Sequence, residues 1–183
     1  MRAVVIYESM FGNTHLVADA IADGLRTRGE AVVVPVDRAD EALVRSADLI
    51  VVGGPTHAHG MSREDTRIGA VIASNDKPGS SFILDADAEG RGLRDWFASL
   101  GRVETDAAAF DTRVDLPAAI SGRASKGIAR KLRRHGANLI SEPRSFLVTT
   151  ANYLLPDEQA HACDWGARLG NGYRAADVSR PVG

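Results

Sequence analysis

Cysteine is almost absent from this sequence, and long apolar runs are missing altogether. Cys163 is the one cysteine among 183 residues. A single thiol excludes an internal disulfide and a cysteine-ligated cluster, and it fits a reducing compartment. No apolar run is long enough to cross a bilayer, and the first residues lack the basic-then-apolar pattern of a signal peptide. We therefore expect a cytoplasmic protein that does not interact with a membrane.

An excess of charge of one sign is also lacking. The sequence has 22 lysines and arginines against 24 aspartates and glutamates, which gives a net charge of −2. A chain balanced in this way has no overall field that attracts nucleic acid or anionic lipid. The basic run ARKLRRHG, residues 129–136, is interpreted as the solvated outer face of an amphipathic helix. No nucleic-acid partner is expected.

The composition is otherwise that of a globular domain, with 44% hydrophobic and 25% charged residues. At this length we expect one domain over residues 1–178 and a frayed tail over 179–183. The stretch SNDKPGSSFILDADAEGRG, residues 74–92, has the least regular pattern and is interpreted as an inserted surface excursion, and the role of the wider segment 61–91 stays open.

Strand-like and helix-like patterns alternate along the chain. The apolar run AVVIY, from Ala3 to Tyr7, is typical of a strand buried on both faces of a parallel sheet. Further strands are predicted at residues 31–36, 48–54, 107–114 and 145–149, and helices at 13–28, 40–47, 92–100, 124–140 and 157–170. Pro35 favours the sheet edge for the second strand. This alternation predicts an α/β fold with a doubly wound parallel sheet covered by helices on both faces.

The loop SMFGNT, Ser9 to Thr14, directly follows the first strand, where open α/β sheets bind their ligands. A helix is expected to begin near Asn13, so unpaired N–H groups and the positive end of the helix dipole would face a ligand there. Gly12 permits a close backbone approach, while the hydroxyl and amide side chains can donate hydrogen bonds. The pattern predicts a site for a phosphate monoester, and a helix N-cap without a ligand is the alternative.

The two commonest phosphate loops are missing. The sequence contains neither G-x-x-x-x-G-K-[ST] nor a G-x-G-x-x-G that follows a strand. Nucleoside triphosphates and dinucleotides are therefore disfavoured as ligands.

The stretch VIYESMFGNTHLVADAIADGL, residues 5–25, resembles the opening of flavodoxins, whose loop of this type holds the phosphate of FMN. The stretch DLIVVGGPTHAHGM, residues 48–61, is similar to their third strand and the loop beside the isoalloxazine ring, and residues 107–114 and 145–149 resemble their last two strands. The resemblance implies a three-layer, flavodoxin-like sandwich with a five-stranded parallel sheet of order 2-1-3-4-5. It also implies FMN as the cofactor.

The resemblance also assigns binding roles. Phosphate would be bound by Ser9, Met10, Gly12, Asn13 and Thr14. One side of the flavin ring would be lined by Pro55, Thr56, His57 and Gly60, and the other side by Asp111, Thr112 and Arg113. For Arg113, a cation near the flavin pyrimidine and a surface salt bridge are the two alternatives.

The two ring loops depart from the usual flavodoxin pattern because neither HAHGM nor DTRVD contains a Trp, Tyr or Phe. Stacking on the ring would therefore be reduced. The near-neutral charge also differs from the strongly acidic surface that steers many flavodoxins to basic partners. His57 could instead donate to a flavin carbonyl or pass a proton to a substrate, since an ordinary imidazole titrates near neutrality.

Two sequence patterns, one with histidines and one with acidic residues, resemble metal sites, but neither is interpreted as one. His57 and His59 could bind a metal with Glu64 or Asp65, yet no further His/Cys cluster accompanies them, so no metal is expected. The stretch DADAEG, residues 85–90, imitates half of a calcium loop, but its twelfth place is Trp96 rather than a glutamate. It is interpreted as a solvated acidic loop.

The resulting hypothesis is an FMN-binding, flavodoxin-like electron-transfer protein with no catalytic side chains of its own. One alternative is an FMN-dependent NAD(P)H or quinone reductase in which His57 or His59 donates a proton. Another is a module that kept the fold, lost the cofactor and binds a protein partner. The sequence names neither a redox partner nor an oligomeric state.

Overall fold

The computed structural model describes residues 1–57, 60–62 and 91–177. Its strands are β1 (Arg2–Tyr7), β2 (Glu30–Pro35), β3 (Leu49–His57), β4 (Gly60–Met61), β5 (Asp106–Val114), β6 (Asn138–Leu139) and β7 (Arg144–Val148). Its helices are α1 (Asn13–Arg26), the 3-10 turn η1 (Val36–Arg38), α2 (Glu41–Arg45), α4 (Leu93–Ser99), α5 (Ala118–Ser121), α6 (Ala124–Arg134) and α7 (Glu158–Asp177). The strands and helices alternate as the sequence pattern predicts.

The sheet runs in the order β2-β1-β3-β5, and β6 and β7 both pair with β5 on its far side. These pairs are parallel, whereas β4 turns back and pairs antiparallel with the end of β3. The predicted α/β fold with order 2-1-3-4-5 is confirmed, with the last position shared by two short strands. β2, which ends at Pro35, is the edge strand as predicted.

The prediction of a helix over residues 124–140 is wrong for its last residues. α6 ends at Arg134, and Gly136 then adopts a φ of +96°. A glycine in the left-handed region ends a helix and turns the chain. Residues Asn138–Leu139 therefore join the sheet as β6 beside the start of β5, and β7 pairs with its second half.

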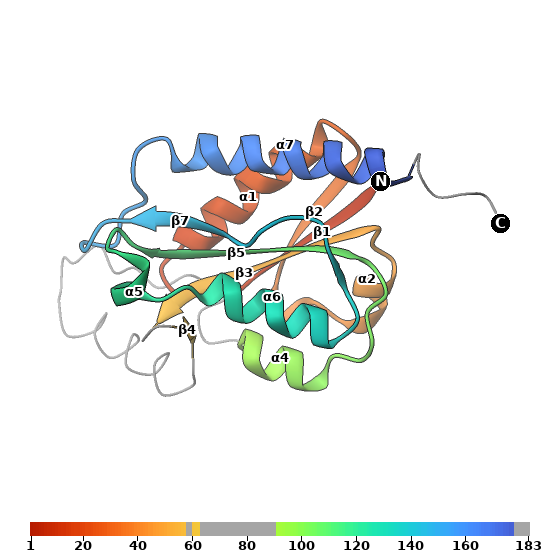
Figure 1. Cartoon of the computed structure of the whole chain (residues 1–183), viewed down its shortest axis with the longest axis horizontal. Helices are drawn as coiled ribbons and strands as arrows, with labels where there is room; N and C mark the ends of the chain where they lie inside the picture. Colours follow the sequence, from red (N-terminus) through yellow and green to blue (C-terminus); the bar gives the residue numbers. More distant parts are fainter. Residues whose placement is uncertain (58–59, 63–90, 178–183) are drawn as a thin grey trace.

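Successive residues of the central strands bury against opposite faces of the sheet. Along β1, Val4 and Ile6 pack into one core, while Val5 and Tyr7 pack into the other. Helices α1 and α7 cover the second of these faces, and α4 and α6 cover the first (Figure 1). Because both faces are covered, the strands read as continuous apolar runs rather than alternating ones.

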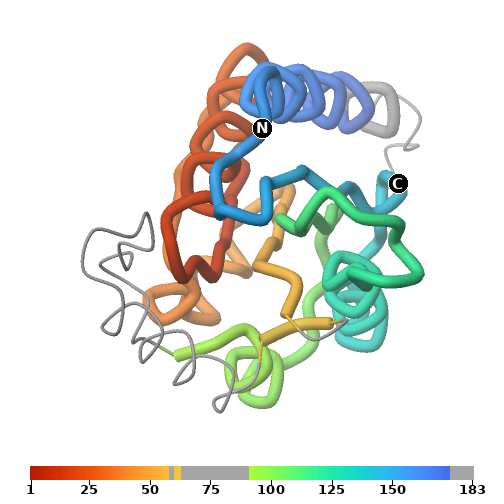
Figure 2. The backbone as a smooth tube through the Cα atoms, turned by 90° about the vertical axis from the view of Figure 1, so that its left-hand side faces the viewer, coloured from red at the N-terminus to blue at the C-terminus, as the bar shows by residue number. Residues whose placement is uncertain are grey.

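Helices α1 and α7 lie side by side with their backbones close together (Figures 1 and 2). A Cβ atom placed on Gly24 of α1 would lie 2.0 Å from the carbonyl oxygen of Cys163, and one on Gly166 of α7 would lie 2.1 Å from that of Ile21. Only glycine fits at these two crossing points.

Three large aromatic side chains are buried in the core: Trp96, Phe97 and Trp165. The indole N–H of Trp96 donates to the carbonyl oxygen of Ala39 at 2.7 Å. Leu16 of α1 is about half exposed. Cys163 is a free thiol, as predicted.

Most of the predicted surface excursion, residues 74–90, lies outside the described residues, as does the predicted tail 179–183. Among the helices that the structure describes, none combines the length and the hydropathy needed to span a bilayer.

Candidate functional site

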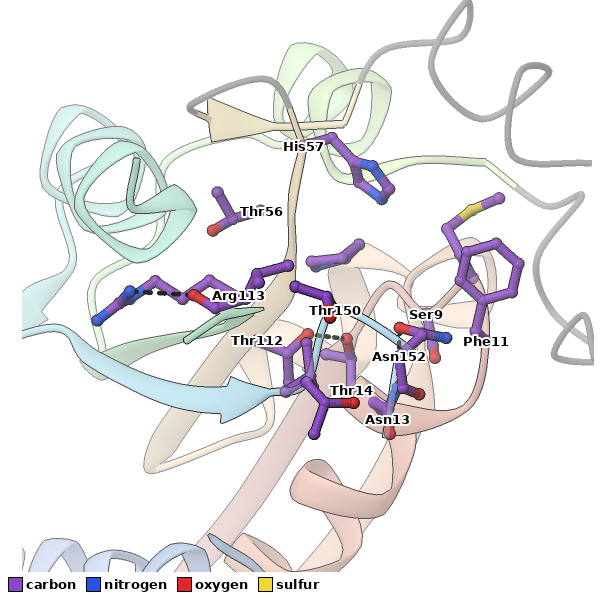
Figure 3. A pocket seen from close by; sticks show the side chains of 15 residues that line it. Ser9, Phe11, Asn13, Thr14, Thr56, His57, Thr112, Arg113, Thr150 and Asn152 are labelled. Atoms are coloured by element: carbon purple, nitrogen blue, oxygen red, sulfur yellow. Dashed lines mark hydrogen bonds between the residues drawn. The ribbon is translucent and has the colours of Figure 1, made fainter. Parts of the chain in front are cut away.

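A pocket of about 210 Å³ opens where β1, β3, β5 and β7 end (Figure 3). Nine of the twelve predicted site residues line it: Ser9, Met10, Asn13, Thr14, Pro55, Thr56, His57, Thr112 and Arg113. Six further residues complete the lining: Phe11, Val114, Val148, Thr149, Thr150 and Asn152. The pocket thus lies at the carboxyl ends of the parallel strands, where a doubly wound sheet binds ligands.

The loop after β1 is shaped by Gly12, which has a φ of +82° and open space around its Cα. The Gly12 N–H donates to the Ser9 hydroxyl oxygen at 3.1 Å, and α1 starts at the next residue. Because this oxygen accepts, the O–H of Ser9 is still available as a donor.

The Thr14 hydroxyl joins this loop to β5. Its oxygen lies 2.8 Å from the hydroxyl oxygen of Thr112, and both side chains are buried. Either hydroxyl could donate in this pair, so one O–H serves the mutual bond and the other can donate elsewhere. The pair therefore fixes two walls of the pocket and retains one donor for a ligand.

The loop also carries several unpaired backbone donors. Within the described part of the chain, four of its N–H groups donate to no protein acceptor: those of Ser9, Met10, Asn13 and Thr14. Two of them belong to the first turn of α1, where the helix dipole favours negative charge. An uncharged loop with these donors is suited to a phosphate group.

The second wall is the end of β3, which Thr56 ties to neighbouring elements. Its hydroxyl donates to Asp111 Oδ2 at 3.0 Å and accepts from the N–H of Ala124 at 2.9 Å. The same Asp111 oxygen accepts from the N–H of Ser125 at 2.8 Å. Asp111 is fully buried and is not among the lining residues, and its carboxylate binds the start of α6.

Two predicted glycines are not among the lining residues. Gly12 shapes the loop without contributing a side chain, and Gly60 pairs with His57 where β4 turns back on β3. The other residues considered for metal binding, His59, Glu64 and Asp65, lie outside the described residues, and so does the DADAEG stretch.

His57 is the titratable side chain of the pocket whose protonation is shifted. Burial lowers the pKa of its imidazole below 6.5, and the nearby carboxylate of Glu8 opposes this shift in part. The Glu8 carboxylate accepts from the hydroxyl of Ser62 and from the N–H of Leu93. The His57 Nε2 atom is buried and forms no hydrogen bond with a described residue. At neutral pH the imidazole is therefore uncharged, which corrects the expectation of a pKa near neutrality.

Acid is expected to destabilise the folded protein through His57. Since the pKa of His57 is lowered by folding, the unfolded chain binds a proton that the folded chain excludes once the pH drops below about 6.5. The stabilisation present above that pH is lost as the pH falls toward the lowered pKa. Urea unfolding at pH near 7.5 and near 5.5 should show a larger loss in the wild type than in His57→Gln. Equal losses in the two proteins would exclude this role.

Arg113 lines the pocket, and its side chain forms hydrogen bonds to the turn that follows β5. One guanidinium nitrogen, Nη1, donates to the carbonyl oxygens of Val114 and Leu116 at 3.3 and 2.6 Å and to the Ser121 hydroxyl at 3.0 Å. It forms no salt bridge with a residue that the structure describes. Arg113 thus holds the turn between β5 and α5 against the edge of the pocket.

The loop after β7 was not predicted as part of the site. Thr149, Thr150 and Asn152 follow the fifth predicted strand at its carboxyl end, and this position with its hydroxyl and amide side chains is the signal that could have identified them. Phe11, also missed, gives the pocket one aromatic side chain from the loop after β1.

Comparisons with known proteins match a family profile over part of the chain and the fold over nearly all of it. Residues 5–77 match the sequence profile of the family described as flavodoxin. A flavodoxin from the domain Archaea is 20% identical, with a TM-score of 0.63 over 95% of this chain and 99% of its own. Flavodoxin 1 from Bacillus cereus is also 20% identical, with a TM-score of 0.61 over 96% and 98%. A flavodiiron protein from Giardia intestinalis is 22% identical with a TM-score of 0.61, over 98% of this chain and 38% of its own.

A sequence comparison with curated proteins gives no match. The structural matches, at about one identical residue in five, establish the fold alone.

Proposed function

We propose that this protein binds one FMN noncovalently and takes part in electron transfer, because its fold and the sequence of residues 5–77 are flavodoxin-like. When bound, FMN supplies the redox chemistry, and the chain supplies binding, orientation and partial exclusion of water. The described pocket residues include no acid/base pair that would perform chemistry of its own.

The main support for this proposal is the group of hydrogen-bond donors in the loop Ser9–Thr14. The start of α1 is surrounded by four backbone N–H groups without an acceptor in the described residues, by the O–H of Ser9 and by the remaining O–H of the Thr14 and Thr112 pair. A phosphate monoester is a dianion with three acceptor oxygens, and hydrogen bonds to a charged group are worth roughly 1.5–3 kcal/mol each. A site of neutral donors at a helix start suits such a group.

The rest of the pocket fits the flavin part of the ligand. Pro55 and His57 form one wall, Thr112 and Val114 another, and Phe11 offers an apolar ring. Buried polar atoms of native proteins are nearly always paired. In the described residues, the Nε2 of His57 lies in this pocket without a partner, so a ligand with polar ring edges would satisfy it. The volume of about 210 Å³ is below the roughly 300–1,000 Å³ of fully enclosing sites, so the pocket would enclose only part of the cofactor.

An exposed apolar turn beside the pocket supports electron transfer to another protein. Leu116 and Ile120 are 44% and 59% exposed, and Arg113 holds their turn next to the pocket lining. Apolar side chains fixed at the rim of a redox site give a partner protein a place to dock. This arrangement favours a carrier.

A reductase acting on a quinone or similar acceptor is the second candidate, and His57 is the observation that favours it. Its uncharged imidazole lies in the pocket, and Nε2 has no partner among the described residues, so this atom could accept a proton or, as the N–H tautomer, donate a hydrogen bond to an acceptor molecule.

We also propose a cytoplasmic location, because the single cysteine is a free thiol, as is usual in a reducing compartment.

Titration of FMN with the purified protein tests this proposal. We expect quenching of FMN fluorescence with one site per chain, and slow reduction by NAD(P)H unless a separate reductase is added. Steady turnover of NAD(P)H with a quinone would favour the reductase instead. No quenching at any protein concentration would overturn FMN binding and leave a module that binds a partner without the cofactor.

A further inference from the structure

The turn after β7 is a closed structure that ends at the pocket. The N–H of Thr149 donates to the carbonyl oxygen of Tyr153 at 2.7 Å, and the N–H of Asn152 donates to that of Thr149 at 3.0 Å. Asn152 itself has a φ of +64°, in the left-handed region that asparagine tolerates better than most residues. The turn therefore holds the Asn152 side chain in a defined position.

The orientation of two amide side chains follows from one backbone carbonyl. An amide group of Asn13 lies 2.9 Å from the carbonyl oxygen of Asn152, which can only accept, so the Asn13 atom is the donor Nδ2. The same Nδ2 lies 3.1 Å from the Asn152 side-chain amide, whose contacting atom must then be the acceptor Oδ1. The remaining atom of Asn152 is consequently a donor, Nδ2.

This donor has no partner. The Nδ2 atom of Asn152 is buried, it makes no hydrogen bond with any residue that the structure describes, and Asn152 lines the pocket. Figure 3 shows Asn152 beside Asn13 and Ser9, at the start of α1. A buried amide N–H₂ left unpaired costs free energy unless a ligand accepts from it.

We propose that Asn152 is a ligand-binding residue whose Nδ2 donates to the phosphate of the monoester held by the loop Ser9–Thr14. The inference rests on the proposed function, because FMN is the monoester in question. It adds a donor from the loop after the last strand to a site otherwise built on the loop after the first. Asn13, the first residue of α1, positions this donor through its two hydrogen bonds.

Two variants test the proposal. Asn152→Gly keeps the left-handed backbone and removes the amide, so the FMN dissociation constant should rise about 10- to 100-fold, and that of riboflavin, which lacks the phosphate, less than about 3-fold. Asn152→Asp places a carboxylate against the phosphate and should weaken FMN further than Asn152→Gly does. Fluorescence titration at one ionic strength measures both ligands.

The matched control is Asp157→Gly. Asp157 also has a positive φ, +67°, but it does not line the pocket. Relief of backbone strain alone would leave FMN affinity unchanged in both glycine variants, so a loss confined to Asn152→Gly supports the phosphate contact. Unchanged FMN affinity in Asn152→Gly, or an equal loss for riboflavin, would overturn it.

A further experiment distinguishes a failure of this inference from a failure of the proposed function. If the wild type does not bind FMN, the proposed function fails, and inorganic phosphate becomes the probe. Stabilisation of the wild type against thermal unfolding by inorganic phosphate, lost in Asn152→Asp, would still support the donor role. No stabilisation of the wild type by inorganic phosphate would overturn that role as well.

Discussion

Replacement of Gly24 by alanine is expected to lower the free energy of unfolding by about 3 kcal/mol or more, at the upper end of overpacking penalties. The added Cβ would lie 2.0 Å from the carbonyl oxygen of Cys163 and 2.6 Å from the backbone nitrogen of Ala167. Both obstacles are backbone atoms of α7, so no side-chain rotation relieves the clash, and the two helices must separate. Gly166→Ala, which meets the carbonyl oxygen of Ile21, is expected to behave in the same way.

Gly172→Ala is the matched control for this prediction. Gly172 also lies in α7, but a Cβ there meets nothing within 4 Å. Alanine is a better helix former than glycine by about 0.8–1.0 kcal/mol, so this variant should be neutral or slightly more stable. Urea unfolding of the three variants decides the matter: a Gly24→Ala protein within about 0.5 kcal/mol of the wild type would show that the helices are not in close backbone contact.

The second large effect concerns the cofactor. Ser9→Ala combined with Thr14→Ala is expected to weaken FMN binding by about 100-fold or more, because two hydroxyl groups at the start of α1 are removed and each charged hydrogen bond is worth roughly 1.5–3 kcal/mol. Riboflavin should lose far less affinity, since it has no phosphate. Thr112 would retain its own hydroxyl, so a residual preference for FMN should remain.

Ser125→Ala provides the control for the double variant. Ser125 is fully buried at the start of α6, its hydroxyl oxygen has no partner among the described residues, and it does not line the pocket. This substitution should leave the affinity for both flavins unchanged. If the double variant lost FMN and riboflavin affinity equally, the hydroxyl groups would support the pocket without contacting the phosphate.

The layout of the sheet follows from the sequence because buried parallel strands read as continuous apolar runs. AVVIY and the run from Leu49 are such strands, and the small polar loop after the first marks the ligand end of the sheet. The end of α6 could not be predicted from the sequence, because Leu139 continues the helical spacing of apolar residues. Only the left-handed Gly136 separates the helix from β6. A periodic pattern does not show where a glycine turns the chain.

The side chains of the site were harder to predict than the loops that carry them. Asp111 and Thr112 are neighbours on one strand, yet Thr112 faces the pocket while Asp111 binds the N–H of Ser125. Which of the two side chains faces the pocket depends on the helix that begins beside the other face of the strand. Such a tertiary contact cannot be predicted from the local sequence. The position of Asn152 after the last strand could have indicated it, but its contact with Asn13, far away in the sequence, could not be predicted.

The structure of the protein with FMN bound would test the central claim most directly. We expect the phosphate to lie against the N–H groups of Ser9–Thr14 at the start of α1, with the flavin ring between the ends of β3 and β5. A phosphate bound elsewhere, or a flavin that leaves the start of α1 uncontacted, would contradict it.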